Sequence, residues 1–145
     1  MKVLIQRVKK ASVTIDDKLF SEIGKGLLIF VGVTKEDTIE NAKKLAKKIS
    51  TLRIFEDEND KMNLSLQDVK GEALIVSQFT LCGDCKKGTR PSFDNAASPN
   101  IANKLYELFI SELKQYNIPC KTGKFQAMMD VLLINDGPVT FLVEK

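Results

Sequence analysis

Chemistry in this chain has to proceed without histidine, which does not occur among its 145 residues. Its absence removes every Ser-His or Cys-His nucleophile pair and the commonest general base near neutral pH. The polar residues best placed for chemistry are Ser77, Gln78 and Thr80, which with Phe79 lie at the end of a long apolar segment, 71–81. That segment is predicted to be a central strand, and a functional site is expected at its polar end.

Three cysteines, Cys82, Cys85 and Cys120, supply the only thiols. An odd number does not form a disulfide framework and fits a reducing compartment. A structural zinc ion wants four N or S ligands, which this chain cannot supply without a carboxylate, so neither a metal nor another cofactor is expected. Cys82 and Cys85 have the C-x-x-C spacing of a thiol redox protein, which is one alternative function, although such a pair needs a helix to begin there.

Charge and hydropathy argue against several classes of protein. With 22 basic and 19 acidic residues the net charge is +3, well below the excess of a protein that coats nucleic acid non-specifically. A non-catalytic RNA-binding module is a second alternative, but it needs exposed aromatic side chains, and the aromatic residues fall mostly in core patterns. No apolar run reaches the roughly 20 residues of a membrane span, and residues 1–8 are too short for a signal peptide. A cytosolic protein with no membrane partner is expected.

The elements that have to position these residues follow from hydrophobic periodicity. Strand-like segments are 3–8, 11–15, 26–33, 52–55, 71–81, 125–134 and 139–143. Segment 26–33 is continuously apolar, which predicts a strand buried on both faces. Residues 16–18 predict a turn, 82–97 a long functional loop, and 135–138 a hairpin or tight corner.

Two amphipathic helices are predicted between the strands. The first begins at the capping-box spacing of Asp37 and Glu40, and apolar residues then recur with helical period. Its lysines fall off the apolar stripe and are expected on a solvated face. The second begins with Ser98 as its N-cap and Pro99 as its first residue. Two helices among several strands, with 43% hydrophobic residues, predict one mixed α+β domain over residues 1–145.

Two motifs, Ser-Gln-Phe-Thr-Leu at 77–81 and Asn-Asp-Gly-Pro-Val-Thr at 135–140, together resemble the D-aminoacyl-tRNA deacylase family, the D-tyrosyl-tRNA(Tyr) deacylases. Either motif alone is weak evidence, but both occur in the right order in a chain of the family's length. The likeness also covers 6–8 with 11–13, the loop at 88–93, and 105–106 with Phe109. It implies a three-layer β/β/α fold with mostly antiparallel sheets, and a homodimer in which each pocket uses residues from both subunits.

The resemblance implies hydrolysis of the ester between a D-amino acid and its tRNA, and of glycyl-tRNA mischarged on tRNA(Ala). The catalytic residues that it implies are Ser77, Gln78, Phe79 and Thr80, and the partner is the 3′ end of an aminoacylated tRNA. Such an ester is already activated, so placing a water and stabilising an oxyanion matter more than a strong base. Backbone N–H groups near Phe79 and Thr80 could form the oxyanion hole, and in the family the terminal 2′-hydroxyl of the tRNA assists.

The substrate-binding residues implied by the resemblance are Gly137, Pro138, Arg7 and Met129. In the family the Gly-Pro bond is cis and enters the other subunit's pocket, where its carbonyls reject an L side chain by collision. Glycine, which has no side chain, passes this filter. An arginine at the place of Arg7 braces that turn, and Met129 lines the adenine site or the core. The chain departs from the family at Gln126, where the family has glycine, and a side chain there reshapes the adenosine side of the pocket.

Most of these residues also have a purely structural interpretation. Thr80 could pack by its methyl group, and a nucleophilic role is disfavoured because no base is available to activate it. Ser77 and Gln78 could bond to local backbone at a strand terminus. Phe79 is expected to be partly core and partly pocket wall, and Arg7 could be a surface charge on a strand.

Overall fold

Two α-helices, a short 3-10 helix and eight strands form the structure, a computed structural model that describes residues 1–145. The strands are β1 (Lys2–Ile15), β2 (Lys18–Ile23), β3 (Gly26–Gly32), β4 (Phe55–Glu56), β5 (Met62–Leu64), β6 (Glu72–Ser77), β7 (Cys120–Thr122) and β8 (Asp130–Glu144). The helices are α1 (Ile39–Thr51), the 3-10 helix η1 (Phe79–Cys82) and α2 (Pro99–Lys114). The mixed α+β class with two main helices is confirmed.

Strand β1 organises the main sheet because three strands pair with it. β8 runs antiparallel along nearly its whole length, from Lys2 to Thr14. On its other side β1 pairs first with β3 and then, beyond Val8, with β2, again antiparallel. β6 joins β3 and β7 joins β6, both in parallel. The expectation of mostly antiparallel sheets is confirmed, with two parallel pairs on the β3 side.

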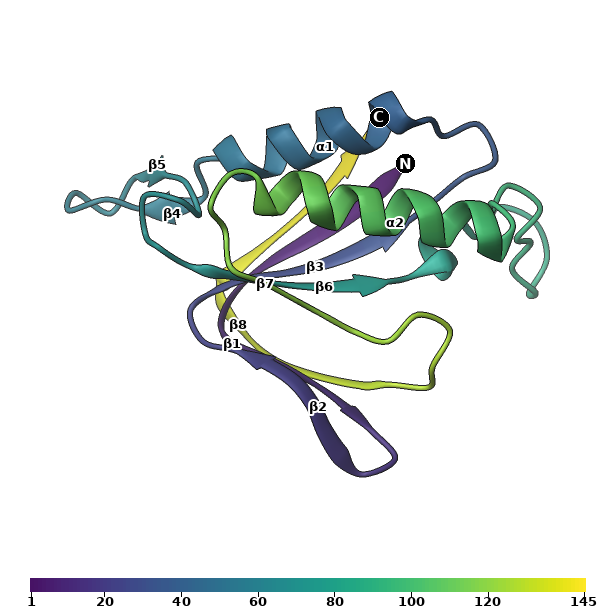
Figure 1. Cartoon of the computed structure of the whole chain (residues 1–145), viewed down its shortest axis with the longest axis horizontal. Helices are drawn as coiled ribbons and strands as arrows, with labels where there is room; N and C mark the ends of the chain where they lie inside the picture. Colours follow the sequence, from purple (N-terminus) through teal and green to yellow (C-terminus); the bar gives the residue numbers. More distant parts are fainter.

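The two halves of β1 belong to different layers (Figure 1). Its first half lies with β3 and β6 beneath α1 and α2, whereas its second half turns away with β2 and the first half of β8. A large core fills the space between the sheet and the helices, and a smaller core lies between the two β layers. This is the expected three-layer β/β/α arrangement.

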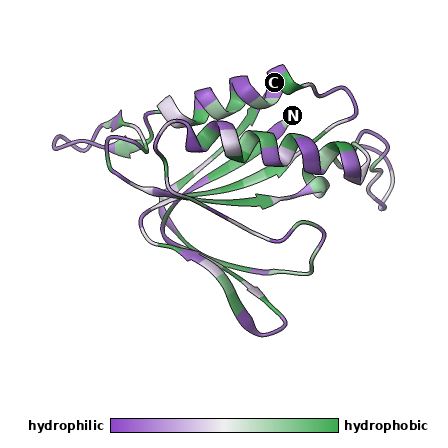
Figure 2. Ribbon diagram, viewed as in Figure 1, coloured by the Kyte–Doolittle hydropathy of each residue, from purple (hydrophilic) through white to green (hydrophobic).

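Strand β3 is apolar throughout because both of its faces are covered. Leu27 and Ile29 belong to the core on the helix side, and Leu28 belongs to the smaller core between the β layers. Every residue of β3 except Phe30 is buried, which confirms the strand predicted for 26–33. Figure 2 shows β3 and β6 as mainly hydrophobic ribbon, whereas the helices alternate between hydrophobic and hydrophilic residues. The strand ends next to the polar motif are therefore anchored in two cores.

The capping box of α1 lies one residue later than the sequence spacing predicts. Thr38 is the N-cap: its hydroxyl accepts from the Asn41 N–H at 3.4 Å, and the Asn41 side chain accepts from the Thr38 N–H at 2.9 Å. Asp37 is not available for capping because its carboxylate accepts from the N-terminal ammonium of Met1 and from the N–H of Thr34. The four lysines of α1 are exposed, as expected.

The prediction of a hairpin or corner at 135–138 is wrong, because β8 continues past these residues in one direction as a single strand. Val8 pairs with Asn135 and Gln6 pairs with Thr140, so the residues between Asn135 and Thr140 leave the ladder as an excursion. The strand resumes its course because β1 offers a pairing edge on both sides of that excursion.

Other boundaries shift for local reasons. Segments 3–8 and 11–15 join into β1, while 52–55 and 71–81 are strand only in part, at Phe55 in β4 and over Glu72–Ser77 in β6. Residues 125–127, predicted as strand, lie in a turn before β8 begins. The turn at 16–18 is confirmed. Asp16 and Asp17 have φ values of 49° and 57°, as in the tight turns that join antiparallel strands.

Candidate active site

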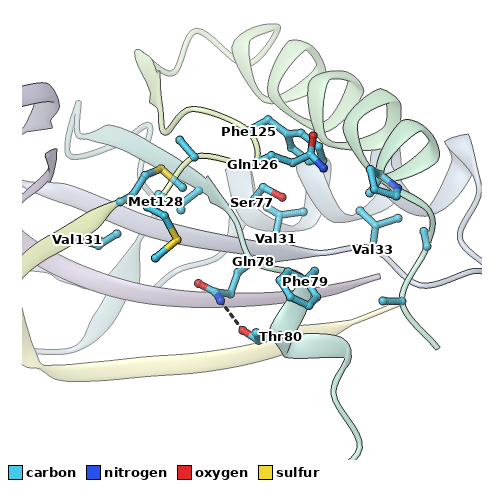
Figure 3. A pocket seen from close by; sticks show the side chains of 17 residues that line it. Val31, Val33, Ser77, Gln78, Phe79, Thr80, Phe125, Gln126, Met128 and Val131 are labelled. Atoms are coloured by element: carbon cyan, nitrogen blue, oxygen red, sulfur yellow. Dashed lines mark hydrogen bonds between the residues drawn. The ribbon is translucent and has the colours of Figure 1, made fainter. Parts of the chain in front are cut away.

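A cavity of about 780 Å³ opens where the parallel strands β3 and β6 end. The end of such strands is a common place for a ligand site. The start of α2 and the segment 125–131 form the other walls (Figure 3). Its lining residues are Val31, Val33, Val76, Ser77, Gln78, Phe79, Thr80, Ala96, Ala97, Pro99, Ala102, Phe125, Gln126, Ala127, Met128, Met129 and Val131.

The predicted catalytic residues come together because the chain leaves β6 abruptly after Ser77. The Gln78 N–H still donates to Val31 O at 2.8 Å, and η1 then begins at Phe79. Gly32 permits this close approach, since a Cβ there would lie 2.9 Å from Leu81 Cβ and 3.0 Å from Gln78 O. The polar motif is therefore a 3-10 turn packed on the end of β3.

The turn presents unused hydrogen-bond donors. The N–H groups of Phe79 and Thr80 begin η1 and have no acceptor within the chain, as is usual for the first N–H groups of a helix. The side chain of Gln78 donates through Nε2 to Thr80 Oγ1, which Figure 3 marks with a dashed line. Two backbone donors thus lie beside a hydroxyl that is itself held by an amide.

No ionisable side chain lines the pocket. Of its 17 lining residues 12 are hydrophobic, and the side chains of Ser77, Gln78, Thr80 and Gln126 supply its side-chain hydrogen-bonding groups. No carboxylate, lysine or tyrosine in the lining thus replaces histidine as a general base. The arrangement can place and polarise a bound ester, but its lining cannot accept a proton near neutral pH.

Phe79 lies farther into solvent than its sequence pattern predicts. Its side chain is 57% exposed, so the expectation that it is partly core is wrong. Phe79 belongs to neither core, and the buried residue of η1 is Cys82. Phe79 instead packs against Phe93, with ring centroids 5.0 Å apart and an interplanar angle of 59°.

The opposite wall holds Met129 and the residue that departs from the family pattern. Gln126 has a φ of 61°, in the left-handed region where glycine is the natural choice. Met129 is half-buried, and its Sδ would lie 2.8 Å from a Cβ at Gly123, so Gly123 makes room for it. Behind this wall the buried hydroxyl of Tyr106 donates to Ile75 O at 2.7 Å, and burial raises the pKa of that hydroxyl.

Gly137 and Pro138 do not join the other predicted site residues within one chain. Both are exposed, neither lines the pocket, and the peptide bond between them is cis. They form the tip of the excursion from β8. Gly137 has a φ of 127°, and a Cβ there would meet Val139 Cγ2 at 2.7 Å. The excursion thus lies outside the lining of its own chain's cavity.

Arg7 is buried beneath that projection, so its interpretation as a surface charge is wrong. Its guanidinium donates from Nε to Asp136 O at 3.2 Å and from Nη1 to Ile54 O at 2.8 Å. Nη2 lies 3.4 Å from the carboxylate of Glu56, and Nε lies 3.4 Å from that of Asp136. Arg7 therefore ties the excursion to the chain between α1 and β4, and its part in substrate binding stays a prediction.

Much of the pocket was not predictable as a site. Val31, Val33, Ala96 and Ala102 are ordinary apolar residues, and no local pattern distinguishes those that face a cavity from those that face a core. Phe93 belongs to the loop that the sequence marks as functional, but nothing in the sequence shows that its ring reaches Phe79.

The cysteine arrangement does not support a redox pair. Cys82 is buried and donates to Val33 O at 3.4 Å, whereas Cys85 is exposed and both thiols are free. Burial raises the pKa of Cys82, the reverse of the lowered pKa of a reactive thiol. No helix begins at this pair, since α2 starts only at Pro99.

The chain has no group of three or more Cys, Asp or Glu side chains placed to hold a metal ion. None of its helices has the length and apolarity to cross a membrane.

Solved structures share this architecture. The chain superposes with a TM-score of 0.94 and 40% identity on a protein named c-Myc DNA unwinding element binding protein, covering 100% of this chain and 99% of the other. A structure described as a "probable eukaryotic D-amino acid tRNA deacylase" matches with a TM-score of 0.85 over 99% of this chain and 98% of that one. At 17% identity, the second likeness concerns the fold alone.

Sequence relatives agree with the resemblance carried by the two motifs. A protein of Exiguobacterium sibiricum named D-aminoacyl-tRNA deacylase is 57% identical over 145 residues, 100% of both chains. One of the same name from Persephonella marina is 58% identical over 100% of this chain and 98% of its own. The family model described as D-Tyr-tRNA(Tyr) deacylase matches residues 4–144. With nearly its whole length matched and its fold shared, the chain belongs to the D-Tyr-tRNA(Tyr) deacylase family.

Proposed function

We propose that this chain is a cytosolic homodimeric hydrolase that cuts the ester between a D-amino acid and its tRNA, and that it also acts on glycyl-tRNA mischarged on tRNA(Ala). Family membership makes it a D-aminoacyl-tRNA deacylase, a hydrolase of the aminoacyl-tRNA ester bond. The proposal adds a mechanism, a chiral filter and a dimer. The observation that carries the mechanism is a pocket without any ionisable side chain.

Proton transfer then falls to the substrate. In every 3′-aminoacyl-tRNA the 2′-hydroxyl lies beside the ester, where it can relay a proton from the attacking water to the leaving 3′ oxygen. The water oxygen bonds to the carbonyl carbon while the ester C–O bond breaks, which releases the free amino acid and the 3′-hydroxyl. The free N–H groups of Phe79 and Thr80 stabilise the oxyanion. The Gln78 amide holds the Thr80 hydroxyl in place to orient the water.

Handedness is sensed by the backbone of the second subunit. The exposed turn at Gly137 and Pro138, held from below by Arg7, enters the partner's pocket next to Ser77 and Phe79. Its carbonyls face the Cα of the bound amino acid, so an L side chain collides with them and a D side chain points to open space. Glycine has no side chain to reject, and glycyl-tRNA therefore passes the filter. Met129 and Gln126 line the side that receives the terminal adenosine.

Initial rates on three substrates test the activity and its handedness. D-tyrosyl-tRNA and glycyl-tRNA are expected to be hydrolysed, and L-tyrosyl-tRNA hardly at all. Comparable rates on both enantiomers contradict the chiral filter. A thiol redox protein or a non-catalytic RNA-binding module cleaves none of the three substrates. Cleavage of D-tyrosyl-tRNA therefore contradicts both alternatives, and failure on all three substrates supports them.

A tRNA that ends in 2′-deoxyadenosine tests the proton relay. Because the relay is the only acid-base group in the mechanism, D-tyrosyl ester on this tRNA is expected to be cleaved about 100-fold more slowly or worse. The spontaneous hydrolysis of each ester is subtracted as the control. An unchanged enzymatic rate on the 2′-deoxy substrate assigns proton transfer to another group.

A further inference from the structure

We propose that Phe79 and Phe93 form a stacking platform, at the edge of the pocket, for the base that precedes the terminal adenosine of the aminoacylated tRNA. The inference rests on the proposed function, because its occupant is the strand whose last ribose carries the ester. The two side chains are 57% and 38% exposed. Exposed rings of this kind bind single-stranded RNA through the π-face that every base offers. The platform continues the pocket, because Phe79 belongs to both.

Phe93 is held in place although it lies in a loop. The ring rests on Gly83, where a Cβ would lie 3.0 Å from Phe93 Cε1. Directly before it, Ser92 and Asp84 exchange two backbone hydrogen bonds of 2.9 and 2.8 Å, and directly after it the Ala96 N–H donates to Phe93 O at 2.9 Å. A ring fixed in this way loses little conformational entropy when a base stacks on it.

The loop also carries three positive charges close in sequence to Phe93, where they can meet the phosphates of an RNA strand. The Ser92–Asp84 pair closes a tip that holds Lys86, Lys87 and Arg90. All three are exposed, and none forms an ion pair within the chain. Cations beside stacking rings are the usual composition of a groove for single-stranded nucleic acid. A second copy of this chain, itself of net charge +3, complements such a tip less well.

Substrates of increasing length measure the platform directly. D-tyrosyl esters of adenosine, of the trinucleotide CCA and of whole tRNA are compared by kcat/KM and KM. For the wild-type protein, KM is expected to be about tenfold lower with the CCA ester than with the adenosine ester. This gain in affinity is the effect of one stacked base. Phe93→Ala removes that gain but leaves the adenosine ester within about twofold of wild type, since Phe93 does not line the pocket. Phe93→Tyr keeps the gain, because it keeps the ring.

Matched controls separate this result from others. Phe20→Ala removes another exposed phenylalanine, on β2 and outside the pocket lining, and leaves the gain intact. An equal loss on adenosine and CCA esters with Phe93→Ala overturns the platform, because Phe93 then only supports Phe79. The platform is also overturned if the Phe93→Ala variant sediments as a monomer, because the partner subunit then covers the ring in the wild-type dimer. Failure of the wild-type protein on every ester contradicts the proposed function itself.

The cations are tested by salt dependence. Replacing Lys86, Lys87 and Arg90 by serine is expected to reduce the slope of log kcat/KM against log salt on tRNA by about 0.7 for each phosphate that the tip no longer neutralises. The matched control replaces Lys43, Lys44 and Lys47 on α1 by serine, which leaves the slope unchanged. Equal slopes for the wild type and the loop variant show that the tip does not meet phosphates and overturn that part of the proposal.

Discussion

The hydroxyl of Thr80 has a hydrogen-bond donor beside it and no base. Gln78 Nε2 donates a hydrogen bond to Thr80 Oγ1, and the pocket offers no group that could accept the hydroxyl proton of Thr80. An unactivated hydroxyl is a poor nucleophile, so Thr80 is expected to orient water. Thr80→Ala should therefore lower kcat by about tenfold or less, the worth of one hydrogen bond, whereas Thr80→Trp fills the pocket and abolishes activity.

Single-turnover rates with D-tyrosyl-tRNA measure both variants. Thr80→Val is the matched control, because it keeps the shape of the side chain and removes only the hydroxyl. It should behave as Thr80→Ala does. Mass spectrometry of the wild-type protein during turnover provides a second check, and an aminoacyl adduct on Thr80 would assign it the nucleophilic role that we reject.

The same lack of ionisable groups predicts the pH dependence of the reaction. A histidine or carboxylate base produces a bend in log kcat/KM near its pKa. With no such group in the pocket, the only bend expected in the profile on D-tyrosyl-tRNA between about pH 6 and about pH 8.5 is that of the substrate's own α-amino group, whose pKa is about 7.7–8.0. The measurement needs correction for spontaneous ester hydrolysis and a check of folding at each pH. A clear inflection below about pH 7, where the α-amino group of the substrate stays protonated, points to a titrating residue brought by the second subunit.

Gln126 has the backbone conformation of a glycine. A left-handed φ costs a residue with a side chain about 1–2 kcal/mol, and glycine recovers most of this at an entropic cost of about 0.5–1 kcal/mol. Gln126→Gly is therefore expected to raise the free energy of unfolding by about 0.5–1 kcal/mol. Gln115→Gly is the control, since Gln115 is also an exposed glutamine but has a φ of −63°. It should lower stability by a similar amount, and equal signs for the two variants in denaturant unfolding contradict the argument.

Between elements, Arg7 joins the excursion of β8 to the chain before β4. Replacement by methionine leaves Ile54 O and Asp136 O without their donor, at a cost of about 2–3 kcal/mol. The ion pair with Glu56 adds little, because Glu56 is half exposed. Arg7→Met should also lower the ratio of D- to L-tyrosyl-tRNA cleavage, since the turn loses its support. Arg7→Lys keeps one donor and should lie between the wild type and Arg7→Met.

Denaturant unfolding and the two initial rates check this at the same protein concentration. A loss of stability with an unchanged D-to-L ratio shows that the turn holds its shape without Arg7. A stability change below about 0.5 kcal/mol shows instead that water replaces the guanidinium.

The elements that the sequence predicts well are those whose own residues carry the whole pattern of burial. Segment 26–33 and the two helices have a continuous or periodic apolar pattern that no other arrangement satisfies. The sequence predicts a hairpin or corner where β8 has its excursion, because Asn135 to Pro138 contain turn residues in either case. Only the long pairing edge of β1, remote in sequence, returns the chain to the same direction.

The site divides in the same way. Ser77 to Thr80 could be located because polar residues end an apolar strand, and 82–97 because it is a long loop. The exposure of Phe79 could not be predicted, since it depends on how η1 lies on Gly32. Nor could the separation of Gly137 from the pocket be derived from local patterns, because it depends on the path of a strand at the other end of the chain.

For the whole molecule, that separation has a consequence for assembly. The outer face of β8 exposes Leu132, Ile134 and Leu142, and the turn at Gly137 and Pro138 projects nearby without filling its own pocket. Apolar side chains gathered on one strand face are typical of a subunit contact. We expect a dimer that pairs these faces, and the cross-subunit pocket proposed above requires that each turn then reaches the other pocket. Sedimentation is expected to give one species near twice the 16.2 kDa of the chain.

Mixed dimers test whether the pocket is shared. Thr80→Trp blocks a pocket, and Gly137→Ala distorts a turn, because its Cβ meets Val139 and the Arg7 guanidinium and its φ of 127° disfavours a side chain. Thr80→Trp alone should be inactive, whereas Gly137→Ala alone should lose its preference for D-tyrosyl-tRNA, since the turn is the filter. In a dimer of one with the other, purified through two tags, a cross-subunit site has one open pocket that receives the intact turn, so about half of the wild-type activity should remain with the wild-type D-to-L ratio. A site built within one chain leaves the open pocket with the distorted turn, and its D-to-L ratio then equals that of Gly137→Ala. The Thr80→Trp dimer under two tags is the control for blocked pockets, and a wild-type ratio in the mixed dimer assigns the turn to the partner's pocket.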